Sequence, residues 1–102
     1  METELAKKVS EKVNDLVDEE TSRRYGELNL VTEVVEPSEG TVRVRFRPLQ
    51  AFSPMAVDIG RNIMQAASSV DGVKSVRVEC VGHMMDDLVN RMVNKPEITP
   101  RR

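Results

Sequence analysis

The segment Gly40-Thr41-Val42-Arg43-Val44-Arg45-Phe46-Arg47-Pro48 is the most regular stretch of the sequence. Its apolar side chains, Val42, Val44 and Phe46, alternate with arginines, and successive side chains on a strand point to opposite faces. The spacing predicts a strand with one buried face and one arginine-bearing face, which ends at Pro48 because proline cannot donate to a ladder. A strand of this kind indicates a sheet that helices cover on one face only.

Two further strands are predicted around this segment. The first runs from about Tyr25 to Val35, where apolar and polar residues alternate. The turn residues of Glu36-Pro37-Ser38-Glu39-Gly40 join it to the arginine strand as an antiparallel hairpin. The second covers 76–80, where inward valines and a cysteine alternate with charged residues, and it ends at Gly82.

Three helices are predicted from apolar residues at helical spacing. The first runs from about Glu4 to Val17. The second has Ser53 as its N-cap and Pro54 in its first position, and it stops at Asp71-Gly72. The third follows Gly82. We expect three methionines to fill the core beneath the helices: Met64, Met85 and Met92.

These elements give the order α-β-β-α-β-α. The strand–helix–strand step predicts a right-handed crossover that makes the second and third strands parallel. The expected fold is therefore α+β, with two layers, a mixed three-stranded sheet and helices on one face. We expect a single domain over residues 1–94 and a flexible tail over 95–102, where two prolines occur without an apolar stripe.

Composition narrows the classes of protein. The chain has 102 residues, of which 31% are charged, and a net charge of −2. No apolar run approaches the roughly 20 residues of a membrane span, and the first residues lack the apolar region of a signal peptide. We therefore expect a cytoplasmic protein without a membrane partner.

Charge is unevenly distributed along the chain. Residues 1–40 carry 11 acids and five bases, whereas residues 41–102 carry six acids and 10 bases. The two halves can face each other within the fold, or the second half can present a basic patch to an anionic partner. No aromatic residues lie between the arginines, so the pattern does not favour nucleic acid as the partner.

Residues suited to catalysis or metal binding are scarce. Cys80 and His83 are the sole cysteine and histidine, and no nucleophile–base pair or phosphate-binding loop is recognisable. We therefore expect no enzymatic activity.

The Cys-x-x-His spacing makes Cys80 and His83 weak metal candidates, but a structural zinc site needs four ligands. Cys80 falls on an inward strand face, where a free cysteine acts as a small apolar residue, and His83 is a candidate cap of the last helix.

Several short motifs occur in a specific order. Asp18-Glu19-Glu20 follows the first predicted helix, and Leu28-Asn29-Leu30-Val31 comes after this acidic motif. After the hairpin come Phe52-Ser53-Pro54-Met55 and Asp71-Gly72-Val73. This order resembles that of the SufT and PaaD proteins and of the related cytosolic iron–sulfur assembly component. Their motifs are Asp-Pro-Glu, Leu-Gly-Leu-Val, a loop ending Cys-Pro, and a Gly-Val strand. The resemblance covers about Val9 to Val93.

The resemblance implies a non-enzymatic accessory or adaptor protein in iron–sulfur cluster assembly. Its partners would be iron–sulfur assembly proteins or apo client proteins, and the resemblance allows the chain to hold an iron–sulfur cluster transiently. Ser53 stands at the position of the family's loop cysteine, and Glu19 replaces its proline. A serine hydroxyl is a poor ligand for a soft metal, so we expect the monomer to bind no stable cluster. A homodimer that shares two Cys80 thiolates is the alternative.

The resemblance places the functional site at the loop from Leu49 to Met55. We expect Phe52 and Met55 to form a partner-docking patch. By the resemblance, the motif residues Ser53 and Pro54 belong to this site, and the carboxylates of Asp18 and Glu20 border it. The structural alternatives are that Ser53 only caps a helix, that Asp18 and Glu20 belong to a solvated loop, and that Phe52 plugs the core.

A KH-like RNA-binding module is the alternative function, because its order of elements overlaps the predicted one. Such modules clamp RNA with a Gly-x-x-Gly loop. Here Gly60-Arg61-Asn62-Ile63 supplies one glycine, and it lies inside a predicted helix.

Overall fold

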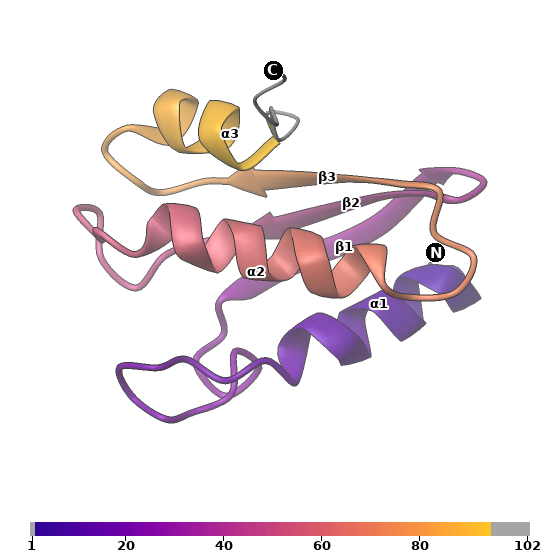
Figure 1. The fold of residues 1–102 in the computed structure, drawn as a ribbon, viewed down its shortest axis with the longest axis horizontal. Coiled ribbons are helices and arrows are strands. Elements are labelled where there is room, and N and C mark those ends of the chain that lie inside the picture. The colour runs from indigo at the N-terminus through magenta and orange to yellow at the C-terminus, as the bar shows by residue number, and fades with distance from the viewer. Residues whose placement is uncertain (1, 95–102) are drawn as a thin grey trace, which may run out of the picture.

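The computed structural model describes residues 2–94 and has the predicted order of elements (Figure 1). The predicted tail, residues 95–102, lies outside the described residues. The elements are α1 (Glu4–Asn14), β1 (Val31–Ser38), β2 (Thr41–Phe46), α2 (Ala56–Ser68), β3 (Ser75–Cys80) and α3 (Asp86–Asn94). None of the helices within residues 2–94 is long and apolar enough to cross a membrane.

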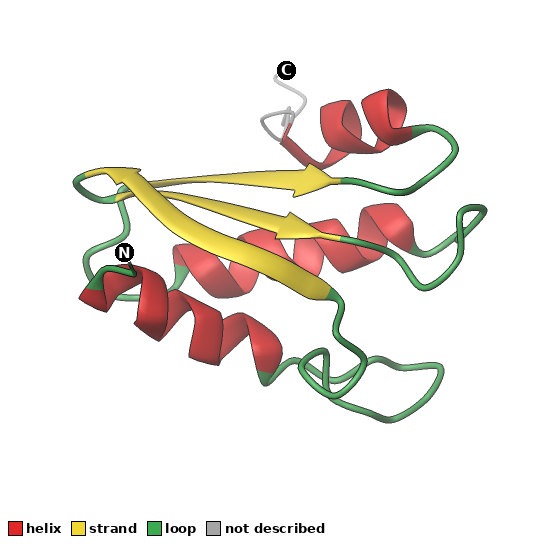
Figure 2. Ribbon diagram, turned by 180° about the vertical axis from the view of Figure 1, so that it is seen from behind, coloured by secondary structure: helices red, strands yellow, loops and turns green. Residues whose placement is uncertain are grey.

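The three strands form one mixed sheet in the order β1-β2-β3. β1 pairs antiparallel with β2, and β2 pairs parallel with β3, so that Val44 stands beside Val34 on one side and Val78 on the other. Helices α1 and α2 cover one face of this sheet, and α3 lies beside β3 (Figures 1 and 2). The predicted α+β class, the mixed sheet and the parallel pairing of β2 with β3 are confirmed.

The register of the arginine strand is the predicted one. Val42, Val44 and Phe46 are fully buried, whereas Arg43 and Arg45 lie half-exposed on the open face. There the Arg45 Nη2 atom lies 3.0 Å from Glu79 Oε1, and its Nη1 atom lies 3.4 Å from Glu33 Oε1. The carboxylates of neighbouring strands thus neutralise these arginines, and each half-exposed pair contributes little to stability.

The edge of β3 is covered by two side-chain amides of α3. Asn94 Oδ1 accepts a bond of 2.9 Å from the Val78 amide, and Asn94 Nδ2 donates one of 2.6 Å to the Val78 carbonyl. Asn90 does the same for the amide and carbonyl of Cys80. A side-chain amide has the same donor and acceptor as a peptide unit. Asn90 and Asn94 therefore bond to the backbone groups of the β3 edge as a fourth strand would.

Gly60 lets α2 approach its neighbours closely. A Cβ atom at this position would lie 2.6 Å from Cγ2 of Val93 and 3.3 Å from Cε1 of Phe46. Gly60 is therefore a buried contact between α2, α3 and β2, inside a helix as expected.

The predicted first strand is wrong over residues 25–30. This segment is a loop whose buried residues Tyr25 and Leu30 anchor it to the core. Asn29 has a φ of 54°, a left-handed conformation that asparagine tolerates and that ends an extended run. The Tyr25 amide bonds to the Leu16 carbonyl at 2.7 Å, so the segment pairs with the end of the first helical region rather than with the sheet.

Several predicted boundaries and one group of core residues also differ. α1 ends at Asn14 rather than Val17, and Val17 instead forms an isolated bridge with Arg24. α2 begins at Ala56, after a turn at 54–55. Met85 and Met92 are 54% and 41% exposed rather than buried. Met85 precedes α3, and the helix packs through Val89 and Val93, so its buried face is rotated away from Met92.

Candidate docking surface

Two loops meet at one end of the sheet. β2 and β3 are parallel, so the loop after Phe46 and the loop after Cys80 leave the sheet at the same end. The Met84 amide donates to the Ala51 carbonyl at 2.8 Å, and the Val81 amide donates to the Phe46 carbonyl at 3.0 Å. Backbone hydrogen bonds therefore join residues that are 33 and 35 positions apart in the sequence.

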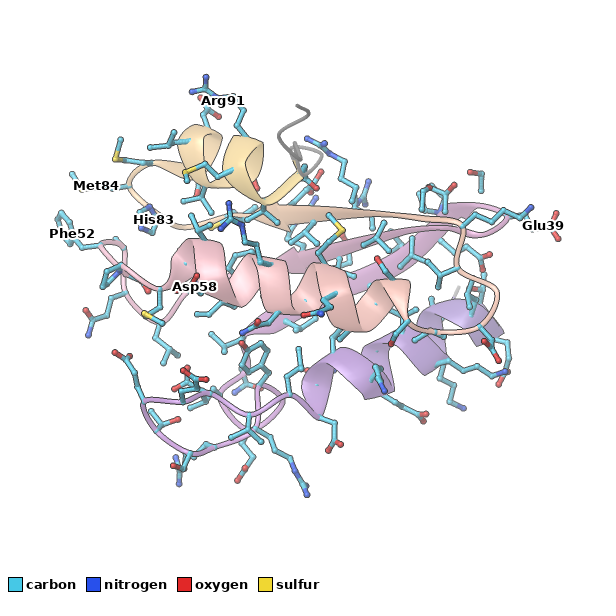
Figure 3. The ribbon with its side chains drawn as sticks, viewed as in Figure 1. Glu39, Phe52, Asp58, His83, Met84 and Arg91 are labelled. Atoms are coloured by element: carbon cyan, nitrogen blue, oxygen red, sulfur yellow. The ribbon has the colours of Figure 1, made fainter. Side chains whose placement is uncertain are left out.

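The two loops carry several exposed apolar side chains. Phe52 is 70% exposed and Met84 is 66% exposed, and both project outward at the same end of the molecule (Figure 3). Leu49 and Met85, from the same two loops, are also more than half exposed. We call these four residues the loop-end patch: Leu49, Phe52, Met84 and Met85. Phe52 thus does not plug the core.

Met55 lies differently from the expected exposed position. It is half-buried and packs against the core cluster, so it does not extend the exposed surface of Phe52. Ser53 does not cap α2, whose N-cap residue is Met55. The Ser53 hydroxyl instead accepts a hydrogen bond of 3.3 Å from the Met55 amide, and Pro54 forms the turn before the helix. Both residues therefore shape the end of the loop.

Met55 also lines a small acidic pocket. The pocket has a volume of about 180 Å³ and brings together four carboxylates: Asp18, Glu19, Glu20 and Asp58. Tyr25, Ile59, Asn62 and Val17 complete its lining. Helix α2 and the loop after α1 thus contribute acids to the same concave surface, and the expected pair Asp18 and Glu20 is part of it.

Asp18 and Glu20 have different surroundings within this pocket. Asp18 is 9% exposed, and its Oδ2 atom accepts hydrogen bonds from the Thr21 amide at 3.0 Å and the Thr21 hydroxyl at 2.9 Å. Asp18 therefore stabilises the turn that follows it. Glu20 is exposed, so its carboxylate is available to a partner.

Tyr25 forms the buried part of the acidic pocket. Asn62 Nδ2 donates a hydrogen bond of 3.3 Å to the Tyr25 hydroxyl oxygen. Burial raises the pKa of Tyr25, the bond from Asn62 lowers it, and the carboxylates of Asp18, Glu19 and Asp58 raise it further. The hydroxyl therefore stays protonated at neutral pH and retains a proton that it can donate.

The two weak metal candidates have other roles in the structure. Cys80 is 1% exposed, and burial together with the nearby Asp86 carboxylate raises the pKa of its thiol to about 12. Both ring nitrogens of His83 are engaged: Nδ1 with the Met85 amide at 3.0 Å and Nε2 with the Ser53 carbonyl at 2.9 Å. No group of three or more histidine, cysteine or acidic residues in the described part of the chain is placed to hold a metal ion.

The sequence did not indicate Met84, Met85, Asp58 or Asn62 as site residues. Asp58 and Asn62 occur four residues apart on α2, a spacing that places them on one helix face. Met84 and Met85 follow the parallel strand β3, and the ends of parallel strands share one edge. These two spacings are the signals that could have identified them.

Comparisons with known proteins bear on the fold. No family model matches the chain. A relative from Methanocaldococcus jannaschii, "Uncharacterized protein MJ1129", is 27% identical over 71 residues, which are 70% of this chain and 75% of the relative. A crystal structure of a domain of unknown function, DUF59, from Bacillus anthracis is similar with a TM-score of 0.70 and 20% identity, over 87% of both chains. The chain therefore has the fold of a DUF59 domain.

Proposed function

We propose that this chain is a non-enzymatic adaptor in the maturation of iron–sulfur proteins, and that it binds an assembly protein or an apo client protein through the loop-end patch. The DUF59-type fold supports this role, because SufT- and PaaD-like domains belong to the DUF59 family and the motif order of this chain resembles theirs. The observation that carries the proposal is Phe52, which is 70% exposed beside the family's cysteine position. Exposed aromatic side chains of this kind are frequent interface anchors.

The charge beside the patch suggests the chemistry of the partner. The acidic pocket shares Met55 with the loop that carries Phe52. A complementary partner would place an apolar side chain on Phe52 and a lysine or arginine in the acidic pocket. We therefore expect a partner segment that combines apolar and basic residues.

The residues of the loop do not fit a bound iron–sulfur cluster. Ser53 offers a hydroxyl, and the one thiol of the chain is buried with a pKa raised to about 12. The usual cluster ligands are cysteine thiolates, so neither group is suited to this role. We propose that the adaptor acts by protein contacts and that a cluster meets it only on the partner. Anaerobic reconstitution of the monomer that gives stoichiometric iron and sulfide would contradict this.

Affinity purification from the native host tests the proposed function. Tagged wild type, Phe52→Ala and Glu39→Ala would be purified in parallel. Glu39 lies in the β1–β2 turn at the opposite end of the molecule from Phe52 (Figure 3). We expect iron–sulfur assembly or client proteins with the wild type and Glu39→Ala, and a loss of at least about tenfold with Phe52→Ala. Equal recovery with all three, or no iron–sulfur proteins among the partners, would refute the proposal.

A further inference from the structure

The two halves of the loop-end patch come from separate loops, and a side chain connects them. His83 leaves the β3–α3 loop and reaches the Ser53 carbonyl, one residue after Phe52, with its Nε2 atom at 2.9 Å. We propose that His83 is a positioning residue that clamps the Phe52 loop against the Met84 loop, so that both apolar side chains form one surface. This inference rests on the proposed function, because it concerns the same patch.

The hydrogen bonds determine which ring nitrogen carries the proton. The Met85 amide can only donate, so His83 Nδ1 must offer its lone pair. The Ser53 carbonyl can only accept, so His83 Nε2 must carry the hydrogen. The neutral Nε2–H form satisfies both partners at once. The ring is therefore held in one orientation by a donor on its own loop and an acceptor on the other.

The backbone at His83 is held in place by Asp86. Asp86 Oδ1 accepts a hydrogen bond of 2.7 Å from the His83 amide, and Asp86 Oδ2 accepts one of 3.1 Å from the Gly82 amide. These bonds hold the turn before α3. The Ser53 carbonyl also accepts a contact of 3.4 Å from the Ala56 amide. His83 thus ties the start of α3 to the turn that precedes α2.

One backbone bond acts beside the His83 clamp. The Met84 amide donates to the Ala51 carbonyl at 2.8 Å, and it flanks the bond between His83 and Ser53. An exposed hydrogen bond between two loops opens readily. The His83 bond to Ser53 adds an attachment close to Phe52, so loss of His83 is expected to free the Phe52 loop and to speed exchange of the Met84 amide.

Two substitutions separate the two bonds of His83. The amide nitrogen of glutamine can occupy the place of Nε2, whereas asparagine is shorter and its oxygen reaches only the place of Nδ1. His83→Gln should therefore keep the bond to Ser53. His83→Asn should keep the acceptor for the Met85 amide and lose the bond to Ser53. The two variants therefore separate the bond between the loops, from His83 to Ser53, from the bond within the β3–α3 loop, from the Met85 amide to His83.

Fluorine NMR provides a direct measurement, because the chain contains only two phenylalanines. With 4-fluorophenylalanine incorporated, Phe46 reports the core and Phe52 reports the loop, since Phe46 is fully buried. We expect His83→Asn to move the Phe52 signal towards that of the free amino acid and to leave the Phe46 signal unchanged. His83→Gln should restore the wild-type Phe52 signal. Exchange of the Met84 amide should be about tenfold faster in His83→Asn alone.

Each outcome separates the clamp from the proposed function. An unchanged Phe52 signal in His83→Asn overturns the clamp, and so does a displaced Phe46 signal, because His83 would then support the core. If the Phe52 signal moves but the partner captured by the wild type binds His83→Asn equally well, the clamp stands and the proposed docking function of the patch fails. If His83→Asn loses both the wild-type Phe52 signal and partner binding, and His83→Gln restores both, the clamp and the proposed docking function are supported together.

Discussion

The two phenylalanines occupy opposite environments at the residue scale. Phe46 is fully buried beneath α2, whereas Phe52 is 70% exposed on a loop. We expect Phe46→Ala to lower the free energy of unfolding by about 3–5 kcal/mol, because it removes apolar contacts and leaves a cavity. Phe52→Ala should change it by less than about 0.5 kcal/mol. Urea unfolding of both variants checks this, and a large loss in Phe52→Ala would show that Phe52 packs on the core in solution.

Cys80 makes the stability of the protein depend on alkaline pH. Its folded-state pKa is raised to about 12 from an ordinary value of 9.0, first by burial. The unfolded chain therefore loses this proton at a lower pH than the folded chain does. The stabilisation is fully present below pH 9.0 and is lost as pH rises from 9.0 towards 12. The raised pKa of Tyr25 acts in the same direction.

Unfolding measured at several pH values tests this linkage. We expect the free energy of unfolding to fall as pH rises above about 9, and to fall less steeply in Cys80→Ala, which has no thiol to titrate. In the folded wild type at pH 8, Cys80 should also resist iodoacetamide and react only once denaturant is added. Rapid alkylation of the native protein would show that β3 is open at this position.

At the scale of elements, the attachment of α3 to β3 depends on side-chain amides. Asn94→Asp keeps an acceptor for the Val78 amide but places a carboxylate against the Val78 carbonyl, where Asn94 Nδ2 now donates at 2.6 Å. We expect a loss of about 1–3 kcal/mol in the free energy of unfolding at pH 7. Near pH 4 the protonated carboxyl can donate again, so part of the loss should return.

Asn94→Ala is the matched control for this substitution. It removes both bonds to Val78 at every pH, so its loss of stability should not recover on acidification. Urea denaturation of the two variants at pH 7 and pH 4, each compared with the wild type, gives the measurement. Identical pH dependence in both variants would mean that the Asn94 amide does not bond to the β3 edge.

The elements also show what a local pattern can predict. The alternation in 41–46 fixes the strand and its register, because the valines and Phe46 have to share one buried face. The alternation in 25–30 has the same form, but the left-handed Asn29 and the bonds of Tyr25 turn it into a loop. For α3, periodicity gives a helix but not the buried face. Packing against α2 decides that face: it buries Val89 and Val93 and leaves Met92 partly exposed.

At the scale of the whole molecule, the candidate site forms where distant segments converge. The sequence indicated Phe52, Asp18 and Glu20 through a resemblance, and the structure places these residues around the loop that contains Met55. Met84 and His83 could not be added from local patterns, because their position depends on the parallel pairing of β2 and β3 and on bonds between loops. The exposed site is therefore harder to predict from local sequence patterns than the buried face of β2.

Charge at the two ends of the molecule provides the last prediction. Glu20→Lys reverses an exposed charge at the acidic pocket, and Glu39→Lys makes the same change of net charge at the opposite end. For the partner captured by the wild type, we expect Glu20→Lys to slow association about three- to tenfold at low salt, and Glu39→Lys to leave it nearly unchanged. The difference should shrink as salt is added. Equal effects of both variants would contradict a basic partner segment.

The asparagine attachment of α3 also has a mechanical consequence. A pulling force applied through residue 94 acts first on the Asn94 amide, and it reaches Asn90 only after the last helical turn has yielded. Helix α3 would thus peel away in steps, before the strand pairs β1–β2 and β2–β3 are pulled apart. The molecule would release its last helix before its sheet, and the sulfur atom of Cys80 would become accessible as this happens.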